Sequence, residues 1–177
     1  MTNVVWVDVE TTGLDPEEDF LLEVGITITS PGPVWAPIDS LSQVFPFNNT
    51  PGHDSVQVVQ TMHETNGLWE ECRKWMDLPF DSRGVEQQFM RFVEEHDALN
   101  SPMYGATAHF DRAWLRTNLP NFEIQFHYRN FDVSTLKAYA IAVRGDADWW
   151  MDREIHRALP DLQDSIANLV HFRNLFR

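Results

Sequence analysis

The chain has 177 residues, of which 43% are hydrophobic, and a formal net charge of −14. The length allows one substantial core but is short for two, so we expect a single domain over residues 1–177, and the hydrophobic content excludes a disordered chain. The negative charge argues against nonspecific binding of long duplexes, which depends on many contacts between basic side chains and phosphates. It remains compatible with a short nucleic-acid substrate whose backbone is held by divalent ions and a few cations.

Cys72 is the only cysteine in the sequence, which excludes an internal disulfide and a cysteine-based zinc site. No run of about eighteen apolar residues occurs, and the N-terminus lacks a basic segment followed by an apolar run. We therefore expect a cytoplasmic protein with no membrane segment.

The first part of the chain predicts an antiparallel meander of three strands. The apolar run at residues 4–9 is typical of a central strand that is buried on both faces. Residues 20–29 predict a second strand. Residues 34–47 predict a third, which Pro37 and Pro46 confine to a sheet edge or to a short piece.

Helices predominate in the rest of the chain, with two short strands between them. We expect helices at 56–62, 67–76, 85–96, 109–118 and 135–143, strands at 101–105 and 127–133, a loop at 144–156, and a final helix after Pro160. The prediction is an α/β fold with a central mixed sheet that contains the antiparallel three-strand meander and is flanked by helices.

Two carboxylates stand two positions apart on the first predicted strand. Since alternate strand residues face the same way, Asp8 and Glu10 leave the same face of the sheet. At a separation of about 4 Å their repulsion is roughly 4 kcal/mol at an effective dielectric of about 20. The first thirty residues contain no Lys or Arg to offset it. A hard divalent cation would offset it, whereas the alternative is two acids at a solvated strand end.

Further acidic residues follow two predicted helix starts. Asp111 lies where backbone amides favour an ionised acid, although by itself it could be an ordinary acid of a first helical turn. Asp161 follows Pro160, which suits a first helical position and disfavours helix at the preceding residue. Positions five apart on one continuous helix point about 140° apart. The break at Pro160 therefore leaves His156 on a loop, free to bend over the same site as Asp161.

Five segments occur in a fixed order across almost the whole chain. They are WVDVETTGLD at 6–15, MHETNGL at 62–68, DR at 111–112, HYRNFDVSTLK at 127–137 and HRALPDLQDSI at 156–166. This ordered set resembles the DEDDh superfamily of 3′-5′ exonucleases and, within it, the oligoribonuclease branch.

The resemblance implies a ribonuclease H-like fold that binds two divalent ions, Mg²⁺ or Mn²⁺. It implies that His156 is the general base that takes a proton from the attacking water, which agrees with the charge change of histidine near neutral pH. Asp164 is a rival for the fourth carboxylate, but the family pattern favours Asp161, and we expect Asp164 to be a partly solvated helix residue. The implied metal ligands are Asp8, Glu10, Asp111 and Asp161.

Substrate contacts are implied in the same way. Leu14 matches a residue that wedges between the two terminal bases. Arg129 is the strongest of the implied phosphate contacts, because a guanidinium makes paired bonds to phosphate. For Ser134 and Thr135 the alternative is a helix cap. The positions near the substrate phosphates, where the family caps a 5′ phosphate and favours dinucleotides, are His63, Thr107, Tyr128, Arg129, Ser134 and Thr135. The family's dimer interface lies near the His-Tyr-Arg segment, so a homodimer is implied.

The sequence departs from the family pattern at two positions that bear on substrate length. Ala106 stands where the family usually has Asn, and Val58 stands where an aromatic residue usually stacks on a base. Such a stack is worth about 1–3 kcal/mol, and Val58 cannot supply it unless Trp69 or another ring substitutes. We expect the chemistry to be retained, while the preference for dinucleotides stays open.

The first hypothesis is an exoribonuclease that releases nucleoside 5′-monophosphates from the 3′ end of short single-stranded RNA. A rival is a proofreading-like exonuclease on single-stranded DNA, because the metal chemistry is indifferent to the sugar. A hypothesis of another class is a non-catalytic interaction module or acidic mimic of nucleic acid, which has no need of this ordered set of residues. The pair Trp149–Trp150 is compatible with a core, an interface or a substrate platform.

Overall fold

The structure, a computed structural model, describes residues 2–47, 57–153 and 155–175. Its strands are β1 (Val4–Thr11), β2 (Leu21–Thr29), β3 (Pro37–Val44), β4 (Met103–Gly105) and β5 (Asn130–Asp132). Its helices are α1 (Gln57–Thr65), α2 (Leu68–Met76), α3 (Ser82–Glu95), α4 (Ala108–Asn118), α5 (Pro120–Glu123), α6 (Ser134–Arg144) and α7 (Ala158–Leu175). Val56, at the start of a predicted helix, lies outside the described residues.

The strands form one mixed sheet in the order β3-β2-β1-β4-β5. The pairs β1–β2 and β2–β3 are antiparallel, whereas β4 pairs in parallel with both β1 and β5. The central mixed sheet with its antiparallel meander is thereby confirmed. β3 is an edge strand and Pro37 is its first residue, a position at which a strand tolerates the missing N–H of proline.

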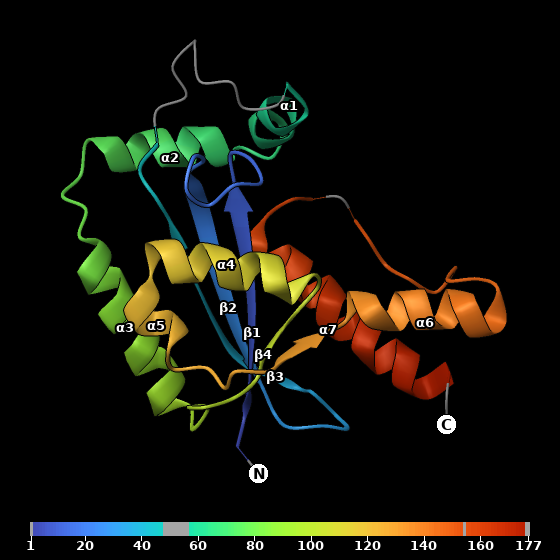
Figure 1. Ribbon diagram of the computed structural model, residues 1–177. Coiled ribbons are helices and arrows are strands. Elements are labelled where there is room, and N and C mark those ends of the chain that lie inside the picture. The colour runs from blue at the N-terminus through green and yellow to red at the C-terminus, as the bar shows by residue number, and fades with distance from the viewer. Residues whose placement is uncertain (1, 48–56, 154, 176–177) are drawn as a thin grey trace.

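The two faces of the sheet are covered by different helices, as Figure 1 shows. Val5, Val7 and Val9 of β1 belong to a core cluster with residues of α3, α4 and α5. Val4 and Trp6 belong to a second cluster with residues of α7. Since strand residues alternate between faces, Asp8 and Glu10 follow Val4 and Trp6 and lie on the side of α7.

The α1–α2 unit lies over the carboxyl end of β1 (Figure 1). A third core cluster anchors it to the sheet, with Leu68, Trp69 and Cys72 of α2 packed on Leu22 of β2. In contrast, α6 projects away from the sheet, and Ala140 alone among its residues is buried. Within the described ranges, no helix combines the length and the apolar character that crossing a membrane requires.

One predicted helix boundary at a proline is wrong. α7 begins at Ala158 and Leu159 is helical, because a proline in the first turn removes an N–H that has no intrahelical partner anyway. The predicted helix at 109–118 is confirmed as α4, which ends before Pro120, and Pro120 begins the short helix α5, which the sequence did not predict. The predicted strand at 127–133 is shortened to β5, because the backbone N–H of His127 donates to Ser101 outside the sheet ladder.

Candidate active site

Carboxylates from β1 and α7 converge at the carboxyl end of the central strand. Oxygen atoms of Asp8, Glu10 and Asp161 all lie within 4.8 Å of one another. Asp111 approaches from α4 and is 2% exposed. Its Oδ1 accepts a hydrogen bond of 3.0 Å from the backbone N–H of Val9, while its Oδ2 is buried with no hydrogen-bond partner among the described residues. An unpartnered buried carboxylate oxygen beside three further carboxylates fits a divalent-cation site.

Burial and mutual repulsion perturb these acids strongly. Burial, followed by the charge of Asp161, raises the pKa of Glu10 to about 9. Burial raises the pKa of Asp111 to about 8 and that of Asp161 to about 6. The pKa of Asp8 is raised well above its ordinary value, chiefly by burial and next by Asp111. The raised pKa values mean that the nearby positive charges do not offset the repulsion among the ionised carboxylates. A bound divalent ion would offset it.

His156 lies on the loop that precedes α7 and adopts a positive φ of 53°. It shares a pocket with Asp8 and Asp161, so the loop brings the imidazole to the carboxylate cluster. The same pocket is also lined by Ala106 and Trp150. Trp150 is a site residue that the sequence reasoning left undecided. The sequence pointed to Trp150 only through the aromatic pair Trp149–Trp150 shortly before His156.

Asp164 is buried, at 7% exposure, so the prediction of a partly solvated residue is wrong. Its Oδ1 accepts from Nε of Arg153 at 2.7 Å and its Oδ2 from the backbone N–H of the same residue at 3.2 Å. One turn later, Asn168 bonds both backbone groups of Met151 at 2.8 Å. Asp164 is buried because it ties the segment before His156 to α7.

Arg157 anchors the backbone on the C-terminal side of His156. Its guanidinium makes paired bonds to Glu23 of β2, at 2.8 and 3.2 Å, and to Glu71 of α2, at 2.8 and 3.2 Å. The side chain of Glu23 is 3% exposed, and its residue lies opposite Glu10 in the sheet register. These bonds raise the pKa of Arg157 above its ordinary value, despite an opposing effect of burial. The cation thus fixes the start of α7 beside the acidic site.

An apolar pocket adjoins the carboxylates on the side of α1. Leu14, which is 84% exposed, lines it together with Val58, Met62 and Phe110, and Glu10 forms part of its wall. Leu14 is thus exposed beside the carboxylates, and its role as a wedge between bases remains a prediction. Trp69 cannot take the place of an aromatic residue at Val58, because it is 2% exposed and packs inside the α2 core.

His63 lies on α1 and is fully buried. Its Nε2 lies 3.2 Å from the backbone oxygen of Thr11 and 4.0 Å from Oε2 of Glu10. Burial lowers the pKa of His63 to about 4, so the imidazole is neutral at neutral pH. Its role as a substrate-phosphate contact remains a prediction, and in this structure the ring faces the interior.

Two of the predicted phosphate contacts meet at one carboxylate. The backbone N–H of Thr107 donates to Oδ1 of Asp132 at 3.0 Å, and the hydroxyl of Ser134 donates to the same oxygen at 2.5 Å. Thr107 has a positive φ of 58°. Thr135 follows in the exposed first turn of α6. The backbone N–H of Ser134 also donates to this oxygen, at 2.9 Å, so Asp132 and not Ser134 is the acceptor for it at the start of α6.

Tyr128 and Arg129 lie on the exposed loop before β5. Tyr128 is 74% exposed, and the guanidinium of Arg129 lies 5.3 Å from the centre of its ring. Arg112 shapes this loop, because its Nη1 donates to the backbone oxygen of His127 and to Asn130, each at 2.8 Å. The structure thus presents both side chains to solvent.

Comparison with known proteins assigns the family. The model of the family described as "Exonuclease" matches residues 5–169. The chain belongs to the exonuclease family. It is 32% identical to an oligoribonuclease of Ruthia magnifica, over 99% of this chain and 96% of the relative. It is 34% identical to an oligoribonuclease of Idiomarina loihiensis, over 98% and 93% of the two chains. The chain is therefore an oligoribonuclease-like member of the DEDDh exonucleases, as its motifs predicted.

Solved exonuclease structures share the fold. The RNase domain of yeast Pop2 superposes with a TM-score of 0.60 at 14% identity, over 98% of this chain and 76% of that chain. Exonuclease I of E. coli, in complex with an oligonucleotide, gives a TM-score of 0.61 at 17% identity, over 99% of this chain and 43% of that chain. At such low identities the likeness concerns the fold alone, and it confirms the ribonuclease H-like architecture.

Proposed function

We propose that this exonuclease is a metal-dependent 3′-5′ exoribonuclease that degrades short RNA to nucleoside 5′-monophosphates by a two-metal mechanism. The observation that carries the proposal is the cluster of carboxylate oxygens on Asp8, Glu10 and Asp161, within 4.8 Å of one another and next to His156. Asp111 adds a buried oxygen without a partner. These four acids would hold the ions, and Mg²⁺ and Mn²⁺ suit such an all-oxygen set.

The division of labour follows from the positions of the side chains. Divalent ions bound by the four acids would supply an activated water and stabilisation of the leaving 3′ oxygen. His156 takes the proton of the attacking water at a ring nitrogen and returns it to solvent. Arg157, Asp164 and Asn168 hold the backbone on both sides of His156, so the base keeps its position during turnover.

The preference for short RNA is supported by the relatives that are named oligoribonuclease. The apolar pocket around Leu14 and Phe110 adjoins Glu10 and suits the base of a 3′-terminal nucleotide. Thr107, Ser134 and Thr135, with His63, Tyr128 and Arg129, remain the proposed surroundings of the substrate phosphates. Val58 contributes no ring to the pocket, so a less strict preference for dinucleotides belongs to the proposal.

A panel of substrates tests the reaction. The purified protein is given a 5′-labelled dinucleotide, a longer RNA and a single-stranded DNA, each with Mg²⁺, with Mn²⁺ and with EDTA. We expect stepwise shortening from the 3′ end, release of 5′-monophosphates and no cleavage in EDTA. Endonucleolytic fragments, or cleavage that persists in EDTA, would contradict the mechanism. Faster cleavage of DNA than of RNA would favour the proofreading-like alternative.

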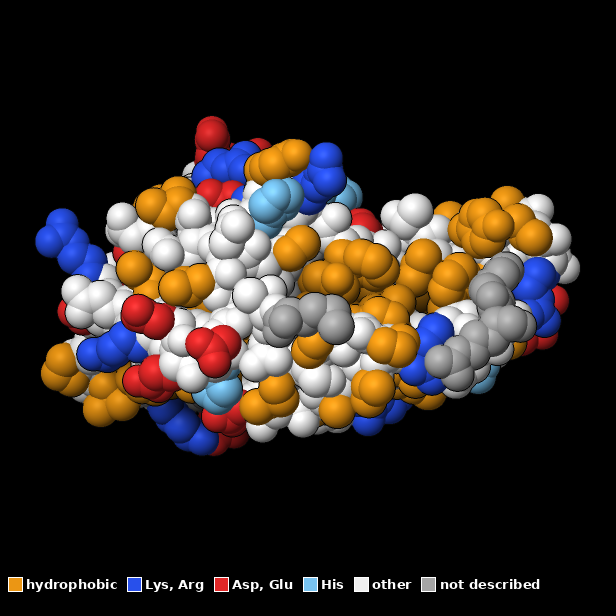
Figure 2. Space-filling view, turned by 90° about the horizontal axis from the view of Figure 1, so that it is seen from below, with side chains coloured by type: hydrophobic (Ala, Val, Ile, Leu, Met, Phe, Trp, Pro, Cys, Tyr) orange, Lys and Arg blue, Asp and Glu red, His pale blue; other side chains and the backbone are white. Residues whose placement is uncertain are grey.

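We further propose the homodimer that the family pattern implies, with an interface near residues 127–129 that extends over α6. Tyr139 and Val143, four residues apart and therefore on one face of α6, are 51% and 58% exposed. On the underside of the molecule, hydrophobic side chains gather across the middle and toward the end at which α6 lies (Figure 2). An exposed apolar surface of this kind is typical of an interface. A light-scattering mass near the 20.6 kDa of one chain would count against the dimer.

A further inference from the structure

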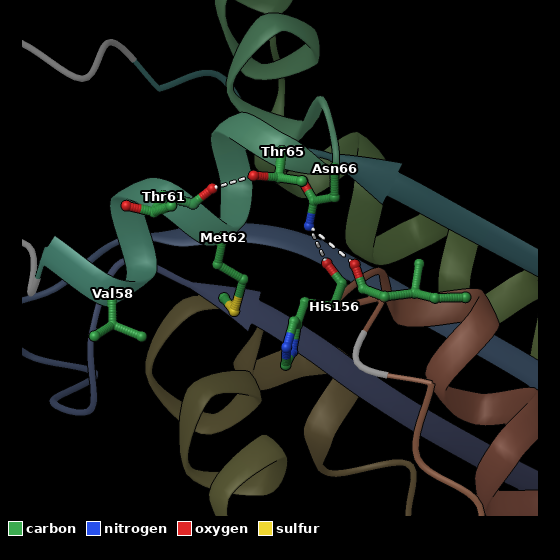
Figure 3. A pocket seen from close by; sticks show the side chains of 7 residues that line it. Val58, Thr61, Met62, Thr65, Asn66 and His156 are labelled. Carbon is green, nitrogen blue, oxygen red and sulfur yellow. Dashed lines mark hydrogen bonds between the residues drawn. The ribbon is translucent and has the colours of Figure 1, made fainter.

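We propose that Asn66 is a positioning residue that holds the loop of the general base His156 through a backbone hydrogen bond from its side-chain amide. The proposal deepens the proposed exonuclease function and rests on it. Figure 3 shows Asn66 reaching from the end of α1 to the loop. Its Nδ2 lies 2.5 Å from the backbone oxygen of His156 and 3.3 Å from that of Ile155, residues about ninety positions further along the chain.

The orientation of the Asn66 amide is determined by its other partners. Its Oδ1 accepts a 3.0 Å hydrogen bond from the backbone N–H of Leu68, so its Nδ2 must point toward the two carbonyls. Nδ1 of His63 lies 3.4 Å from the same nitrogen. The carbonyl of Thr11 requires the proton of His63 on Nε2, which leaves Nδ1 as an acceptor for Asn66. All these contacts favour one orientation of the amide.

The conformation of His156 explains why the loop needs such a bond. Its φ of 53° lies in the left-handed region, which residues other than glycine adopt at a cost of roughly 1–2 kcal/mol. A strained residue persists only where its surroundings fix it, and the bond to Asn66 acts on the carbonyl of the strained residue itself. The contacts of Arg153 and Arg157 hold the segments before and after His156, whereas the bond from Asn66 holds the carbonyl group of His156.

Asn66 also connects the base to the metal-binding strand. His63 links Asn66 to Thr11 at the end of β1 and approaches Glu10 at 4.0 Å. A continuous set of contacts therefore runs from the carboxylate of Glu10 to the backbone of His156. These contacts fix the position of the general base relative to the carboxylates. Loss of the bond from Asn66 would therefore displace His156 without removing any proposed metal ligand.

The test uses two substitutions of Asn66 with different side effects. Asn66→Asp keeps the size and the acceptor for Leu68 but loses the donor. Asn66→Ala loses both bonds and adds no charge, and it replaces Asn66→Asp if the latter does not fold. In the full-length protein with Mn²⁺ and a dinucleotide RNA, we expect kcat to fall about 10- to 100-fold in both variants, with KM and the Mn²⁺ affinity unchanged. Asn118→Asp is the matched control, since Asn118 also donates to a backbone oxygen, at 3.0 Å, but on α4.

A double-mutant cycle separates positioning from general structural support. If Asn66 acts through His156, adding Asn66→Asp to His156→Ala produces no further loss in single-turnover rate. An equal loss of rate in both backgrounds would overturn the proposal, as would a wild-type kcat in both Asn66 variants. A wild-type protein that cleaves no oligonucleotide would instead contradict the proposed exonuclease function.

Discussion

Arg157 gives a quantitative test of how the acidic site is held together. Its guanidinium is the cation that pairs with Glu23, whose side chain is 3% exposed, whereas its second partner, Glu71, is 44% exposed. Arg157→Met keeps the apolar stem but leaves a buried carboxylate unpaired opposite Glu10. Removal of one partner from a buried pair costs about 3–5 kcal/mol, which corresponds to a fall in Tm of about 6–20 °C for a chain of this size.

Chemical denaturation in EDTA, at a pH near neutrality, measures this loss. The matched substitutions are Glu23→Gln and Glu71→Gln. The second breaks a pair that is largely open to solvent and should cost about 0–1 kcal/mol. We expect the order Arg157→Met, then Glu23→Gln, then Glu71→Gln in decreasing loss of the free energy of unfolding. An Arg157→Met variant as stable as the wild type, or equal effects at the two glutamates, would refute the assignment of Glu23 as the critical partner.

Three further outcomes are expected. Asp8→Ala and His156→Ala should each abolish most turnover on a dinucleotide while the circular dichroism spectrum stays native, and a wild-type rate in either would remove that residue from the mechanism. Because the pKa of Glu10 is raised from 4.5 to about 9 and that of Asp111 to about 8, the metal-free folded protein binds protons that the unfolded chain has lost. Its Tm in EDTA should fall as the pH rises from about 5 to about 9, and the increase in Tm caused by Mn²⁺ should grow over that range. Val58→Trp should lower KM for a dinucleotide by about 5- to 160-fold, the equivalent of a stack worth about 1–3 kcal/mol, and an unchanged KM would show that the pocket does not bind the base at this position.

Features that depend on local periodicity and on ordered motifs could be predicted from the amino-acid sequence. The apolar run of β1 and the two-residue spacing of Asp8 and Glu10 followed from strand geometry alone. The order of the motifs carried the family and the fold, which the comparisons confirm. The position of His156 on a loop was also predicted, although α7 begins at Ala158 rather than after Pro160.

Which polar side chains contact one another across the fold became clear from the three-dimensional arrangement. The family pattern already favoured Asp161 over Asp164, and the structure adds the physical reason: Arg153 bonds both oxygens of Asp164, whereas Asp161 lies with Asp8 and Glu10. The sequence left open whether Trp69 stacks on a nucleotide base, and the packing of α2 excludes this because it buries the ring. Asn66 meets His156 across about ninety residues. Such pairings depend on how distant elements pack, because a side chain's partners are set by spatial neighbours and not by the period of its own helix or strand.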